Sequence, residues 1–139
     1  MLRTAVLYYA KPSGQAKLKV LAEALAEGMK KQGARVDVIN GAKAKETRLT
    51  GYHYIAVGCD VRSWFKGELP PELIPSLNNG GIITGKNAFA FVPSASVGTN
   101  STLLKLMNTL EHKGMHLRYS EVLANADAAE ALGQGLKLD

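Results

Sequence analysis

The sequence predicts an α/β protein, a three-layer sandwich on a five-stranded parallel sheet with the strand order 2-1-3-4-5. Short apolar runs typical of strands alternate along the chain with segments whose apolar residues recur every three or four positions, as in helices. Such alternation implies a parallel sheet covered by helices on both faces. Five strands within 139 residues suit a doubly wound sheet. This length also favours one domain over residues 1–139.

Each element has its own local signal. Five apolar segments are expected to be strands: residues 4–10, 34–40, 52–59, 86–93 and 115–123. Helices are expected where apolar residues fall on one face: from Ala16 to a turn at Gly33, at 101–113, and a short one at 126–132. Residues 72–79 predict a short helix at best, because Pro75 interrupts the segment. The polar residues 41–51 indicate a loop or a poor short helix.

Composition predicts a cytoplasmic protein with no membrane contact. No apolar run approaches the roughly 20 residues that span a bilayer. The first residues lack the pattern of a signal peptide, and the single cysteine, Cys59, fits a reducing compartment.

The net charge of +5 is concentrated in residues 1–50, which hold ten basic and four acidic side chains. A basic surface attracts acidic proteins, phosphate groups or nucleic acid. Here a solvated helix face is the simpler interpretation, and we expect no nucleic-acid partner, because the lysines lack an aromatic platform or a recognition motif.

Ligands of a doubly wound sheet bind beyond the carboxyl ends of the strands, where strands 1 and 3 diverge. The loop after the first strand contains Gly14, which lets a backbone approach a ligand, and Ser13 and Lys11, which add a hydroxyl and a charge. The amides of residues 14–18 are expected to open the helix and to face an anion. On this loop alone a plain turn with Ser13 as N-cap is favoured. No Walker motif is present.

Two further loops meet the same edge. In the loop after the third strand, Trp64 either packs against the body or stacks on a planar ligand, and Arg62 either binds an anion or faces solvent. Cys59 is interpreted as a core residue rather than a nucleophile. The loop after the fourth strand, residues 93–100, supplies small residues and backbone amides that could line a ligand edge.

Three segments carry a family resemblance. "VLYYAKPSGQA" resembles the first strand and phosphate loop of flavodoxins, whose usual form is Ser/Thr-x-Thr-Gly-x-Thr. "IAVGCDVRSW" and "GKNAFAFVPSASVGTN" are similar to the two strands and loops that flank the flavin. The chain thus resembles a short-chain flavodoxin over nearly its whole length. The resemblance implies a flavodoxin-like fold that binds FMN through Lys11, Pro12, Ser13, Gly14, Gln15, Ala16, Cys59, Asp60, Val61, Arg62, Trp64, Ser94, Ala95, Ser96 and Gly98.

The phosphate loop is degenerate relative to the family pattern. Lys11 and Ala16 replace two hydroxyl residues, and Val97 and Gly98 stand where the family usually has tyrosine and acidic neighbours. Flavodoxins are usually strongly acidic, which penalises the reduced anionic flavin, whereas this chain is basic. The resemblance therefore implies FMN held at a higher potential than is usual in the family.

The leading hypothesis is an FMN-binding electron carrier without catalytic residues of its own, monomeric or weakly dimeric, with a redox partner protein that the positive charge favours as acidic. The alternative is a flavin-free binding or regulatory module of the same fold. A phospho-receiver domain needs paired carboxylates after the first strand, and "YYAKPS" has none. The histidines His53, His112 and His116 have no metal-ligand spacing and complete no Ser/His/Asp set.

Overall fold

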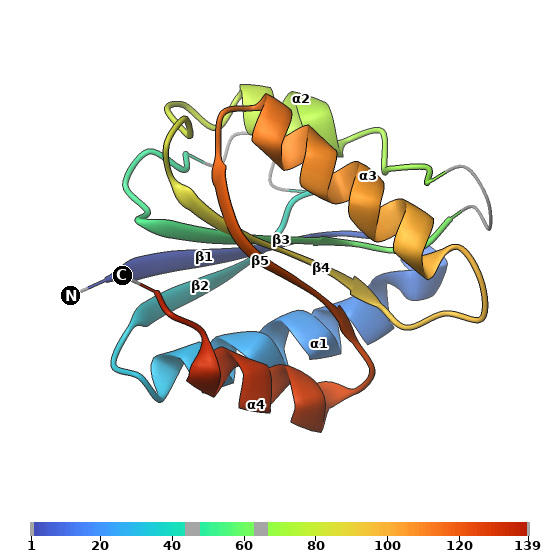
Figure 1. Cartoon of the computed structure of the whole chain (residues 1–139), viewed down its shortest axis with the longest axis horizontal. Coiled ribbons are helices and arrows are strands. Elements are labelled where there is room, and N and C mark those ends of the chain that lie inside the picture. The colour runs from blue at the N-terminus through green and yellow to red at the C-terminus, as the bar shows by residue number, and fades with distance from the viewer. Residues whose placement is uncertain (1, 44–47, 63–66, 139) are drawn as a thin grey trace.

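The computed structural model describes residues 2–43, 48–62 and 67–138, and it confirms the predicted architecture (Figure 1). One parallel sheet has the order β2-β1-β3-β4-β5. Its strands are β1 (Arg3–Tyr9), β2 (Arg35–Asn40), β3 (Tyr54–Cys59), β4 (Asn87–Pro93) and β5 (His116–Leu123). The helices are α1 (Pro12–Lys30), α2 (Leu73–Asn78), α3 (Thr99–His112) and α4 (Ala126–Gly135). Helices α1 and α4 cover one face of the sheet, and α2 and α3 cover the other (Figure 1).

The central strands are buried on both faces, as their nearly continuous apolar sequences require. Side chains alternate between the two faces along each strand. On β3, Tyr54 and Ala56 pack in the cluster under α1 and α4, whereas Ile55 and Val57 pack in the cluster on the opposite face. Two apolar cores therefore hold the sheet between its helical layers.

Helices α1 and α4 touch through their backbones. A Cβ atom added to Gly28 would overlap the carbonyl oxygen of Glu130, and one added to Gly133 would overlap that of Leu25. Glycine at both positions permits this close packing of the two helices. The side chain of Asn125 caps α4 by accepting a hydrogen bond from the Ala128 amide at 2.8 Å.

Several predicted boundaries were wrong. Helix α1 begins at Pro12 rather than Ala16, because proline suits a first helical position, where its missing N–H is not needed. Pro75 likewise lies in the first turn of α2 and does not interrupt it. Helix α3 starts at Thr99, α4 continues to Gly135, and β3 starts at Tyr54.

No helix among the described residues is long and apolar enough to cross a membrane. Of the polar segment 41–51, the described positions 41–43 and 48–51 belong to neither helix nor strand.

Candidate functional site

The β1–α1 junction lies at the carboxyl edge of the sheet, as expected, but its helix opens earlier than the sequence suggested. Lys11 is the N-cap residue and makes no capping hydrogen bond with its side chain. Ser13 is therefore inside the first turn and is not the N-cap. The Gly14 amide donates to the Lys11 carbonyl at 2.9 Å, and Pro12 has no N–H. The exposed Ser13 thus offers both its amide and its hydroxyl at this helix end.

A carboxylate of the protein itself binds the same helix end. Asp60 Oδ2 accepts a hydrogen bond from the Lys11 backbone amide at 2.9 Å, and Asp60 Oδ1 accepts one from Arg62 Nε at 2.8 Å. The side chains of Arg62 and Asp60 are only 9% and 13% exposed. The pair ties the β3 loop to the start of α1 and neutralises the charge of Arg62. Both residues were predicted flavin ligands, and the structure shows them bound to protein groups.

The thiol of Cys59, another predicted flavin contact, lies in the core. Its side chain is fully buried among the residues under α2 and α3. Burial raises the pKa of this thiol to about 12, with a further contribution from the charge of Asp60 that Arg62 opposes. At neutral pH the group is a protonated core side chain, which does not support the predicted contact of the thiol with a flavin. Val61 is half-buried beside it, and Trp64 lies outside the described residues.

The third loop, which follows β4, is joined to α1 by a hydrogen bond from Lys17. Lys17 Nζ, on α1, donates to the Ser94 carbonyl at 3.1 Å. Beyond Ser94, Ala95 and Ser96 are exposed, and Gly98 caps α3 with a positive φ of 81° that favours glycine. Residues 95–101 line a shallow cavity of about 310 Å³.

Two hydrogen bonds thus bring the three predicted loops together at the start of α1, where they meet at one end of the molecule (Figure 1). Lys17 was not among the predicted ligands. A signal for it was available, because Lys17 lies three residues after Gly14 and so shares its helix face. The exposed residues of the β1–α1 junction, Lys11 to Ser13 and Ala16, remain accessible, and Gly14 and Gln15 are half-buried.

The donor set fits a phosphate group in part. Ser13 supplies a hydroxyl and an amide, and Lys11 and Lys17 supply two exposed ammonium groups. A Cβ at Gly14 would lie 3.9 Å from Asp60 Oδ2, an ordinary contact, so packing does not demand glycine there. Glycine instead leaves the surface between Ser13 and Asp60 open. The carboxylate of Asp60 disfavours an anion here, because it is negatively charged and already accepts a hydrogen bond from the Lys11 amide.

No protein-family model matches the chain, and no curated protein matches it. Solved structures do match. A flavodoxin from the domain Archaea superposes with a TM-score of 0.71 at 19% identity, over 95% of this chain and 94% of that one. A short-chain flavodoxin associated with a non-canonical PDU bacterial microcompartment gives 0.71 at 14% identity, over 98% and 97%. Two-electron reduced Megasphaera elsdenii flavodoxin gives 0.68 at 17% identity, over 94% and 96%.

These likenesses extend over whole chains, so the protein has a flavodoxin-like fold, as its sequence motifs predicted. The strand order and the helical layers agree with that class. Identities below 20% establish the fold, and the function has to be argued from the site.

Proposed function

We propose that the protein binds FMN at the carboxyl edge of its sheet and carries electrons. The observation that supports this most is the convergence of the three loops on the start of α1, through the Lys11–Asp60 and Lys17–Ser94 hydrogen bonds. The neighbours of the same fold add support, since one is described as two-electron reduced. Because the sequence identities are low, the assignment of function depends on the chemistry of the site.

Each group at the site would have a definite task. Ser13 would donate its amide and hydroxyl to the phosphate, and Lys11 and Lys17 would balance its charge. The small residues Ser94 to Ser96 would border the ring system, and the sequence expectation for Trp64 is that it covers one ring face. The flavin itself would supply the electron transfer, which needs no acid or base from the protein. Cys59 would stay a neutral core side chain.

Two measurements test FMN binding. The purified protein should show flavin absorption bands, and the apoprotein should bind FMN much more tightly than riboflavin, because the phosphate supplies part of the affinity. Equal affinities for the two flavins, or no binding to either at tens of micromolar (about −6 kcal/mol), would contradict the proposal. Trp64 is the single tryptophan, so quenching of protein emission on titration reports on ring stacking directly.

An acidic redox partner follows from the same proposal. Lys11, the N-cap of α1, and Lys17 and Lys19, on its first turns, are exposed next to the site. Their charge would steer a negatively charged protein toward the flavin, and salt would weaken the encounter. Electron-transfer rates with acidic and basic redox proteins, compared at low and high ionic strength, test this. A rate that is independent of salt and of the partner's charge would contradict it.

A second function, that of a flavin-free binding or regulatory module, is favoured by one observation. The Asp60 carboxylate accepts a hydrogen bond from the Lys11 amide, at the helix end where a phosphate would bind. The same flavin titration separates the two proposals, because the module would not bind FMN.

A further inference from the structure

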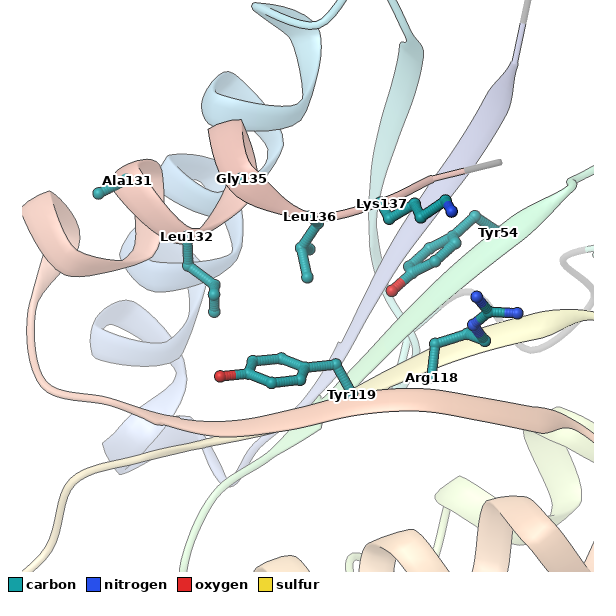
Figure 2. Close-up of a pocket in the computed structure, with 8 residues that line it drawn as sticks. All are labelled: Tyr54, Arg118, Tyr119, Ala131, Leu132, Gly135, Leu136 and Lys137. Carbon is teal, nitrogen blue, oxygen red and sulfur yellow. The ribbon is translucent and has the colours of Figure 1, made fainter.

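A second pocket lies at the opposite end of the sheet from the loops described above. It has a volume of about 340 Å³ and is enclosed by the starts of β3 and β5 and by the end of α4 (Figure 2). This size falls within the usual range for small-molecule sites. The proposed flavin site uses none of its residues.

A β-bulge shapes one wall. In the pairing of β4 with β5, Ala88 faces Leu117 and Phe89 faces Tyr119, so Arg118 is an extra residue. Consecutive strand residues normally point to opposite faces, but the bulge lets Arg118 and Tyr119 both line the pocket. The Tyr119 ring stacks on Phe89 with the centroids 5.9 Å apart, which fixes that wall.

The floor holds a buried hydroxyl without a partner. Tyr54 is fully buried, and no described residue forms a hydrogen bond with its oxygen. Figure 2 shows the hydroxyl pointing into the space between Leu136 and Tyr119. Leaving such a group unpaired costs stability. Burial raises the pKa of Tyr54 to about 12, although the charge of Arg118 opposes the shift, so the hydroxyl remains a proton donor at neutral pH.

The remaining lining combines apolar walls with positive charge. Leu132 and Leu136 face the Tyr119 ring, and Arg118 and Lys137 lie on either side of Tyr54 in the view of Figure 2. No acidic side chain is among the described residues that line the pocket. Within the described part of the chain, neither cation forms an ion pair.

We infer that this pocket binds a small aromatic carboxylate, with its ring between Tyr119 and the leucines and its carboxylate on Arg118 and the Tyr54 hydroxyl. The planar arginine fork matches a carboxylate, and Lys137 adds charge at the mouth. A phosphate ester would bring more charge and more acceptors than these few donors satisfy. Because the Tyr54 oxygen is closed off from solvent, entry requires a rotamer change of a flexible neighbouring side chain.

Titration with 2-naphthoate, followed by amide chemical shifts and calorimetry, tests the inference. Binding should perturb β5 and the end of α4, and 2-naphthamide and 2-naphthyl phosphate should bind at least about tenfold more weakly. Arg118→Gln should weaken naphthoate binding about tenfold. Lys105→Gln, an exposed substitution on α3, is the matched control and should leave binding unchanged.

Tyr54→Phe distinguishes a binding role from a structural one. It removes an unpaired buried hydroxyl, so it should not lower the unfolding temperature, yet it should weaken naphthoate binding severalfold. Four results would overturn the inference: no naphthoate binding at millimolar concentration, equal or tighter binding of the amide or the phosphate ester, an unchanged affinity in Arg118→Gln, or an unchanged affinity in Tyr54→Phe.

Discussion

The carboxylate of Asp60 joins the start of α1 to the β3 loop, because it accepts the Lys11 amide at 2.9 Å and Arg62 Nε at 2.8 Å. A phosphate at this helix end would meet the negative charge of Asp60. The same carboxylate holds the loop in place. If FMN binds here as proposed, we therefore expect Asp60 to lower the flavin affinity and to raise the stability of the fold.

Asp60→Asn is expected to tighten FMN binding and to destabilise the protein. Removing the negative charge should contribute on the order of 1 kcal/mol, about fivefold in affinity. Arg62, with only 9% of its side chain exposed, would lose its partner, at a cost of about 1.5–3 kcal/mol in the free energy of unfolding. Flavin titration and urea unfolding measure the two effects. Asp127→Asn, an exposed carboxylate in the first turn of α4, is the control, and equal FMN affinity in wild type and Asp60→Asn would show that Asp60 does not oppose phosphate.

Lys11→Ser restores the hydroxyl that flavodoxins usually carry at this position, yet it is expected to lower FMN affinity. A charge-assisted contact contributes about 1.5–3 kcal/mol against roughly 1 for a neutral one. The loss should be greatest at low ionic strength, so the salt dependence of binding should flatten. Lys19→Ser, on the same exposed helix surface, is the comparison. Tighter binding by Lys11→Ser would mean that Lys11 is not a phosphate ligand.

The sheet and its order could be predicted because apolar periodicity reports directly on burial, and the central strands β1, β3 and β4 are buried on both faces. The ends of the helices were harder to predict. Pro12-Ser13-Gly14 has the composition of a turn, but proline also suits a first helical turn, and the sequence alone does not decide between them. Gly133 was expected to lie beyond the last helix, but it lies within α4 because it packs against Gly28, more than 100 positions earlier.

The convergence of the loops at the candidate site could be predicted from the sequence, whereas the contacts between them could not. That three loops converge follows from topology, since the carboxyl ends of parallel strands share one edge. The Asp60–Arg62 pair is local, but the hydrogen bond from the Lys11 amide to Asp60 spans 49 positions, which no local pattern encodes. The spacing from Gly14 could have placed Lys17 at the site, but its partner Ser94, 77 positions away, could not be predicted from a local pattern.

The close contact between α1 and α4 predicts that a single added methyl group will strongly destabilise the fold. Gly28→Ala would place a Cβ against the Glu130 carbonyl and should lower the free energy of unfolding by at least about 2 kcal/mol. Gly135→Ala is the matched control in α4, because its Cβ would meet nothing within 4 Å. That substitution should leave the free energy of unfolding unchanged or raise it by up to about 1 kcal/mol. Equal unfolding midpoints for the two variants would contradict a backbone contact between the helices.

The buried thiol of Cys59 predicts a loss of stability at alkaline pH. Its pKa is raised from 9.0 to about 12 by burial, so between these values the unfolded chain releases the proton and the folded protein retains it. The folded state then binds more protons than the unfolded state, and the free energy of unfolding falls as pH rises above 9.0, by up to about 1.4 kcal/mol per pH unit.

Below pH 9.0 this stabilising contribution is fully present, and it is lost progressively as pH approaches 12. Tyr9 and Tyr54, whose pKa values burial also raises from 10.0 to about 12, add to the slope above pH 10. Between 9 and 10 the thiol dominates, so Cys59→Ala should flatten the pH dependence of urea unfolding in that window. A thiol reagent at pH 8 should react with Cys59 only after denaturation. Rapid labelling of the folded protein, or an unaltered slope in Cys59→Ala, would show that the thiol is exposed to solvent.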